Sequence, residues 1–258
     1  MTIKFSINLL LFALCWISVI GQTDQSLLVS SANTITPVVE LYTSEGCSSC
    51  PPADRFLAEL GAHIGPDFHA VPLAFHVDYW NRLGWPDPYS KKQFTERQRW
   101  VAHINRQLSI YTPELVVSGQ EARNGALIYD RIRKHNETVA NVAIQLQVER
   151  RVPERLHAEI TFDNSSESLA EGYIAIYENG ITREIGAGEN RGATLYHEFL
   201  VRYWSQPSTV DIGQSKIHAV IDIEPDWEFS NLGLAVVATE PKTGRTLQAV
   251  NAPLRSLY

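Results

Sequence analysis

The sequence has few cysteines and lacks the common motifs of nucleotide-dependent and hydrolytic enzymes. Only three of its 258 residues are cysteine, so no second cysteine pair exists that could complete a four-ligand zinc site. No P-loop, no Gly-x-Ser-x-Gly segment and no His-Glu-x-x-His segment is present. The glycines of Gly186-x-Gly188-x-x-x-Gly192 miss the spacing of a dinucleotide-binding loop. We therefore expect no bound cofactor.

Positive charge is also scarce. The chain has 22 Lys and Arg against 29 Asp and Glu, which gives a formal net charge of -7. Because no basic patch stands out, a nucleic-acid partner is not expected. Hydrophobic residues make up 44% and charged residues 20% of the chain, which is ordinary for a globular protein with a buried core.

Long apolar runs are absent except at the N-terminus. Residues 3–20 are almost entirely apolar and carry only Lys4 as a charge, which is typical of a signal peptide. Small residues permit cleavage after Gly21 or after Ala32, so we predict a leader over residues 1–32, cleaved near 21 or 32, and a periplasmic or secreted protein. An uncleaved leader that anchors the chain stays open, because the run approaches the roughly 18 residues of a membrane span.

A pair of cysteines follows the first predicted strand. Residues 37–43 are β-branched and aromatic, and they predict a strand that ends in a turn. Cys47-Ser48-Ser49-Cys50 comes next, and apolar residues then recur at helical spacing. Pro51 and Pro52 suit the first turn of a helix, so the helix should begin near residues 49–51. Its free N–H groups and dipole would stabilise a thiolate on Cys47, and export permits a disulfide.

The two halves of the chain show different patterns. Residues 33–137 read as β-α-β-α-β-β-α, which predicts an α/β domain with a central mixed sheet and helices on its faces. Residues 138–258 alternate with a period of two, as in Val142, Ile144 and Leu146, which predicts an all-β domain, an antiparallel sandwich. We expect the two domains to join near residues 136–140 and the sandwich to carry no catalytic group.

Several motifs resemble known proteins. Residues 37–136 resemble the thioredoxin-like superfamily, because Thr112-Pro113 opens a strand well after the cysteines. Four segments are also similar to an exported bacterial family designated domain of unknown function 1223. The thioredoxin-like resemblance implies that Pro113 is cis, lies beside the cysteines and shapes the groove for a partner. The same resemblance implies that Cys47 has the more exposed sulfur and attacks, and that Cys50 resolves the mixed disulfide. It also implies that Glu40 takes up a proton. The four segments are residues 38–54, 75–80, 111–113 and 188–192.

Three functions stay open at this point. The leading hypothesis is an extracytoplasmic thiol–disulfide oxidoreductase that acts on a protein or small molecule bearing a thiol or disulfide. The second is a copper(I) module that uses Cys47, Cys50 and His76, because copper(I) prefers thiolates. The third is a non-catalytic binding protein in which the cysteines form a structural disulfide. Contact with a membrane is expected only through an uncleaved leader.

Overall fold

The computed structural model describes residues 26–257, which form a mixed α/β fold built mostly of strands, with three α-helices among the described residues. The helices are α1 (Pro51–Ala62), α2 (Lys92–Ile104) and α3 (Gly125–Asn136), and short 3-10 turns cover Asn81–Leu83, Phe229–Asn231 and Leu254–Leu257. No helix among residues 26–257 is both long and apolar enough to cross a membrane. The apolar leader and the cleavage expected near residue 21 lie outside the described residues.

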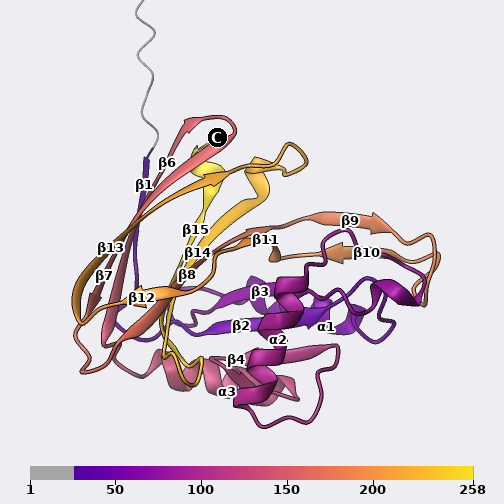
Figure 1. Cartoon of the computed structure of the whole chain (residues 1–258), viewed down its shortest axis with the longest axis horizontal. Helices are drawn as coiled ribbons and strands as arrows, with labels where there is room; N and C mark the ends of the chain where they lie inside the picture. The colour runs from indigo at the N-terminus through magenta and orange to yellow at the C-terminus, as the bar shows by residue number, and fades with distance from the viewer. Residues whose placement is uncertain (1–25, 258) are drawn as a thin grey trace, which may run out of the picture.

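One large sheet runs through both halves of the chain (Figure 1). Its order is β15-β14-β8-β11-β3-β2-β4-β5, and β12 also pairs with β8. The strands from the first half are β2 (Val38–Thr43), β3 (Val71–His76), β4 (Glu114–Val117) and β5 (Gln120–Glu121). Those from the second half are β8 (Ala170–Glu178), β11 (Leu200–Trp204), β12 (Ser208–Val210), β14 (Leu232–Thr239) and β15 (Thr246–Pro253).

The junction of the two halves is a strand pairing. Strand β11 lies parallel to β3 with Leu200 opposite Ala74, and the Ala74 N–H donates to the Phe199 carbonyl at 2.8 Å. The expectation of two domains with separate sheets is therefore wrong. Residues 33–137 leave one edge of β3 unpaired, and an unpaired edge exposes backbone groups that seek a partner. Strand β11 covers that edge.

A second, antiparallel sheet packs against the outer strands of the large one. Its order is β1-β6-β7-β13, and the strands are β1 (Ser26–Ser30), β6 (Val142–Val152), β7 (Arg155–Asn164) and β13 (Gly213–Asp222). Inward side chains such as Ile144 and Ile160 meet Ile176 and Val236 in one apolar core. The period-two pattern predicted for this region is confirmed, because buried and exposed residues alternate from Val142 to Val148.

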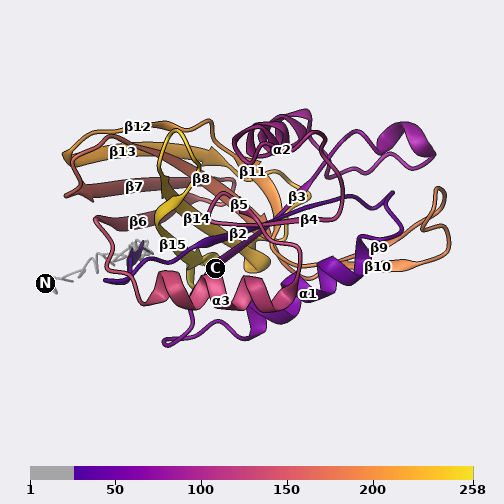
Figure 2. The same cartoon turned by 90° about the horizontal axis from the view of Figure 1, so that it is seen from below.

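The helices cover the two faces of the large sheet (Figure 2). Helices α1 and α3 lie on one face, where their apolar residues pack on Val39 and Leu41 of β2. Helix α2 lies on the other face, over Val38 and Tyr42. Because successive side chains of a strand point to opposite faces, every residue of β2 belongs to one of these two layers, and all six are buried.

A separate hairpin extends from the second half toward α1. Strands β9 (Ile181–Glu184) and β10 (Thr194–His197) pair only with each other among the described residues. The hairpin reaches along the side of the molecule that carries β3 (Figure 1), and β10 contacts α1. This arrangement brings residues 185–193 of the second half to the start of α1.

Candidate functional site

The two cysteines form a disulfide at the start of α1. Their Cα atoms are 5.4 Å apart, and Cys50 is the residue that precedes the helix, with Pro51 and Pro52 in its first two positions. The helix start predicted from the prolines is confirmed. Proline is tolerated there because the first N–H groups of a helix have no internal partner. The Cys47 N–H donates to the Ser44 carbonyl at 3.1 Å, so Cys47 lies in the turn before the helix.

Neither cysteine is accessible to solvent. Cys47 and Cys50 are both 0% exposed, whereas Ser48 and Ser49 between them are exposed. The expectation that Cys47 presents the more exposed sulfur is therefore wrong. The preceding turn would leave the sulfur open if only the local chain were present, so the cover must come from elsewhere in the fold.

The tip of the β9–β10 hairpin binds the turn that holds the cysteines. The Glu189 carboxylate accepts from the Ser48 N–H at 3.1 Å and from the Ser48 hydroxyl at 2.7 Å. The Asn190 side-chain amide donates to the Glu45 carbonyl at 2.8 Å and to the Cys47 carbonyl at 3.0 Å. We call residues 185–193 the cap. Its contacts with the cysteine turn are polar and come from its tip.

The predicted cis proline is present. The Thr112–Pro113 peptide bond is cis, and the pairing of Tyr42 with Glu114 sets Pro113 across from the end of β2 that leads into the cysteine turn. The Trp80 indole N–H donates to the Thr112 hydroxyl at 2.7 Å, which ties the aromatic loop after β3 to the same end of the sheet.

Glu40 does not face the cysteines. It lies on the α2 side of β2, where its carboxylate pairs with Arg97 and accepts from the Tyr42 hydroxyl at 2.5 Å. The proton-uptake role expected for Glu40 is contradicted, because α1 and the disulfide belong to the opposite face. The guanidinium of Arg97 also lies 4.8 Å from the Tyr173 ring centre, so Glu40 is part of a buried ion pair that joins α2 to the sheet.

A buried charged cluster lies beside the cysteine turn instead. Nδ1 of His76, at the end of β3, is 2.7 Å from the Asp87 carboxylate, which also accepts from the Glu45 N–H at 2.9 Å. The Glu45 carboxylate in turn accepts from the Trp85 indole N–H at 2.8 Å and lies 3.2 Å from Nε2 of His197. Glu45 comes two residues before Cys47, so this cluster fixes the backbone that leads into the disulfide.

The cluster shifts the protonation of its members. Burial lowers the pKa of His76, but the carboxylates of Asp87, Asp54 and Glu45 together outweigh burial and leave that pKa raised. Burial raises the pKa of Asp87, whereas His76 and the hydrogen bonds to the carboxylate leave it lowered overall. Burial raises the pKa of Asp54, one turn after Cys50, although His76 and His197 oppose that rise. His76 and Asp87 thus behave as an ion pair, and Nε2 of His76 has no hydrogen-bond partner.

The copper(I) hypothesis finds no support in this geometry. Within residues 26–257, no three His, Cys, Asp or Glu side chains are arranged to hold a metal ion. Cys47 and Cys50 are joined to each other, and a disulfide offers no thiolate to a soft metal. Nδ1 of His76 faces Asp87.

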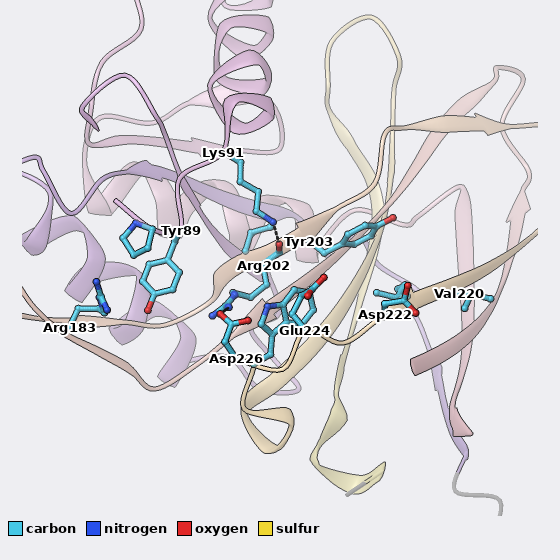
Figure 3. Close-up of a pocket in the computed structure, with 13 residues that line it drawn as sticks. Tyr89, Lys91, Arg183, Arg202, Tyr203, Val220, Asp222, Glu224 and Asp226 are labelled. Carbon is cyan, nitrogen blue, oxygen red and sulfur yellow. Dashed lines mark hydrogen bonds and ion pairs between the residues drawn. The ribbon is translucent and has the colours of Figure 1, made fainter. Parts of the chain in front are cut away.

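A pocket of about 640 Å³ opens beyond the cluster, between the segment that precedes α2 and strands β11 and β13 (Figure 3). Tyr89 separates the pocket from the histidines, since its ring centre is 5.9 Å from that of His76 and 6.1 Å from that of His197. Arg183 and Arg202 lie over Tyr89, with guanidinium carbons 5.8 and 5.3 Å from its ring centre. The pocket also carries acidic groups, so it has no single charge. Its acidic lining residues are Asp222, Glu224 and Asp226.

Sequence reasoning missed the partners that come from far along the chain. Glu45 and Asp87 stand within segments that the resemblance covers or adjoins, but nothing local indicates that they meet. His197, Glu189 and Asn190 lie more than 100 residues beyond the cysteines. One signal in the sequence could have indicated the cap. Segment 188–192 resembles the family, although none of the three hypotheses assigned it a role. The Trp85 contact with Glu45 likewise joins two segments that are 40 residues apart.

The fold and the site together define a mixed α/β protein whose disulfide opens a helix and is covered by a hairpin of the same chain. The chain belongs to the family described as protein of unknown function (DUF1223), whose sequence profile matches residues 38–239. No curated protein matches the sequence.

Two solved structures share the fold. A crystal structure of a protein from Agrobacterium tumefaciens is 24% identical, with a TM-score of 0.59, and the match covers 86% of this chain and 96% of that one. HBP35 of Porphyromonas gingivalis is 14% identical, with a TM-score of 0.66, and the match covers 87% of this chain and 76% of that one. At these identities the similarity extends to the fold alone.

Proposed function

We propose that this protein is an exported thiol–disulfide exchange protein that works through Cys47 and Cys50. The observation that carries the proposal is the disulfide itself, set in the turn and the first position before α1. Pro51 and Pro52 supply no N–H groups at this helix start, but the positive end of the helix dipole lies at the cysteine turn and favours a nearby thiolate. The apolar N-terminal segment supports export, which takes the protein to a compartment where disulfides persist.

We further propose that the first half of the chain is thioredoxin-like. Its support is the order β2, α1, β3, α2, β4, β5, α3, with β2 parallel to β3 and antiparallel to β4. Helices lie on both faces of these strands. The cis Pro113 at the cysteine end of the sheet agrees with this interpretation.

The proposed exchange proceeds in two successive thiolate attacks. A partner thiolate attacks the Cys47 sulfur, the bond from Cys47 to Cys50 breaks, and a mixed disulfide forms while Cys50 leaves as a thiolate and takes up a proton. A second partner thiolate then attacks the partner sulfur and releases Cys47. Two partner thiols are oxidised to one disulfide, and Cys47–Cys50 is reduced to two thiols. The same steps run in reverse reduce a partner disulfide.

Proton supply to Cys50 is assigned in this proposal to Asp54 rather than Glu40. Asp54 lies one helical turn after Cys50 on α1 and interacts with His76 and His197. Burial raises the pKa of its carboxyl, which moves that pKa toward the pKa of a thiol. Glu40 is held by Arg97 on the other face of the sheet.

A structural disulfide is the competing function, and the complete burial of both cysteines favours it. An inert disulfide of an exported protein has a reduction potential below about −300 mV and resists small thiols. An exchanging disulfide has a higher potential. The two functions therefore differ in a measurable quantity.

The deciding experiment compares Cys47→Ser with Cys50→Ser. Both variants lose the same disulfide, so a purely structural role predicts equal losses of stability and no difference in chemistry. We expect Cys50→Ser to form a mixed disulfide with an oxidised cysteine-containing peptide through Cys47, and Cys47→Ser to form none. Mass spectrometry detects the adduct. Equal behaviour of the two variants, with a wild-type potential below about −300 mV, would leave only the structural disulfide.

A further inference from the structure

We propose that the cap, residues 185–193, selects the substrate of the disulfide, so that a cysteine within an extended polypeptide reacts and a small free thiol does not. This inference rests on the proposed exchange function. It assigns the selecting contacts to Glu189 and Asn190, which belong to the segment 188–192 that no other part of the function uses.

The cap is held to the cysteine turn chiefly by its tip. Glu189 binds the N–H and the hydroxyl of Ser48, and Asn190 binds the carbonyls of Glu45 and Cys47. These contacts lie on both sides of the Cys47 sulfur along the backbone. They bring the cap against the turn in which Cys47 is 0% exposed, although its neighbours Ser48 and Ser49 are exposed.

A close backbone approach also holds the cap in place. Gly188 has a φ of +72°, and a Cβ atom there would lie 2.9 Å from the Cβ of Trp85. Only glycine accepts this conformation without strain and leaves room for Trp85. The tip therefore lies against the aromatic loop as well as against the cysteine turn.

The cap can be displaced from the cysteine turn. Strands β9 and β10 form a two-stranded sheet that joins neither of the other sheets of the described structure, and an isolated two-stranded hairpin is only marginally stable in water. Glu189 is exposed, so its hydrogen bonds exchange readily with water. Displacement of the tip of the cap breaks the polar contacts of Glu189 and Asn190, whereas Ile185 at the base of the cap is buried.

The groups that the cap leaves behind indicate what replaces it. They are one backbone N–H, from Ser48, and two backbone carbonyls, from Glu45 and Cys47. The Cys47 carbonyl and the Ser48 N–H point in opposite directions, because they belong to one trans peptide unit. One edge of an extended polypeptide can therefore replace Asn190 at the Glu45 and Cys47 carbonyls. A long segment offers backbone N–H groups well beyond its reacting cysteine, whereas glutathione has only one residue on each side of its cysteine. The favoured substrate is therefore a cysteine in an unfolded or extended protein segment.

The test measures how fast the wild-type disulfide is reduced by glutathione and by an unstructured peptide of about ten residues with one central cysteine. The peptide thiol should react at least tenfold faster at equal thiolate concentration. Asn190→Ala and Glu189→Gln should each raise the rate with glutathione about tenfold, which is the change expected from the loss of one or two hydrogen bonds. Arg191→Ala is the matched control, because its exposed side chain makes no hydrogen bond to the cysteine turn, and it should change neither rate.

The outcomes separate the cap from the exchange function. Equal wild-type rates with glutathione and peptide, or unchanged rates in both cap variants, would overturn the selection by the cap while exchange itself stands. A disulfide that dithiothreitol fails to reduce even in Asn190→Ala would overturn the exchange function as well. Hydrogen exchange of the Ser48 amide in the wild type gives a check that needs no variant, since the peptide should alter its protection and glutathione should not.

Discussion

At the scale of single residues, two buried ion pairs lie on opposite faces of the large sheet. Glu40 pairs with Arg97 beneath α2, and His76 pairs with Asp87 beside the cysteine turn. All four side chains are at most 7% exposed. A buried charge without its partner is costly, so each pair restricts how the elements around it can pack. The His76 pair also holds Glu45, through the Asp87 carboxylate.

His76 should make the stability of the protein depend on pH. Its pKa is raised in the folded state, so its contribution is complete below the unfolded value of about 6.5 and is lost as pH rises through the folded pKa. The lowered pKa of Asp87 has the opposite consequence, because its contribution is lost only when pH falls through that pKa. The free energy of unfolding should therefore decrease from about pH 6.5 upward.

Urea unfolding of wild type and His76→Gln between pH 5.5 and 8.5 measures this dependence. The variant should be less stable at the acid end, and the difference between the two proteins should narrow as pH rises. The other groups that face His76 are Asp54 from α1, Glu45 from the cysteine turn and His197 from β10, and all are retained in the variant. Parallel pH profiles would show that His76 is not charged in the folded protein.

At the scale of secondary structure, the pairing of β1 bears on the two predicted cleavage positions. It pairs with β6 over five residues, from Ser26 opposite Glu149 to Ser30 opposite Gln145. Ser31 continues the pairing, because its N–H donates to the Ile144 carbonyl at 2.8 Å. Cleavage after Ala32 would remove all of these contacts, so the pairing of β1 favours the predicted position near residue 21 over the one near residue 32.

A chain that begins at Asn33 should be less stable than one that begins at Gln22. Leu27 and Val29 pack against the core of the smaller sheet, and burial of such side chains contributes about 1.5–3 kcal/mol each when it is complete. We expect a loss of roughly 2 kcal/mol or more in the free energy of unfolding, measured with urea. Equal stability of the two chains would show that β1 contributes nothing to the fold.

At the scale of the whole molecule, the large sheet makes the two halves interdependent. Strand β11 pairs with β3 from one half and with β8 from the other. Tyr173 and Ala235 of the second half share an apolar core with Phe75 and Phe94 of the first. Separation of the halves would expose this core and an unpaired strand edge.

The protein should therefore unfold as one cooperative unit. Calorimetry of the wild type should give one transition, with a calorimetric enthalpy equal to the van't Hoff enthalpy. Proteolysis between residues 136 and 140 should yield halves that remain associated or unfold, and residues 33–137 expressed alone should lack a stable fold. Two separate transitions, or one half that folds in isolation, would support the two-domain organisation predicted from the sequence.

Some features of this protein follow from the sequence alone, because their causes are local. Pro51 and Pro52 set the start of α1, since proline lacks the N–H that later helical positions require. Alternation from Val142 to Val148 defines a half-buried strand, because strand side chains point alternately to two faces. The pair Cys47 and Cys50 is close enough to form a disulfide in the turn that the sequence predicts before the helix.

Other features depend on which element covers which face, and periodicity does not carry that information. All six residues of β2 are buried, so no alternation shows that Glu40 faces α2 and Arg97 rather than α1. The cap reaches Cys47 across more than 140 residues of chain, and its contacts depend on the position of a hairpin that no local pattern specifies. The disulfide between the cysteines was therefore predictable from the sequence, whereas their burial was decided only by the tertiary structure, because burial is a property of the neighbours and not of the residue.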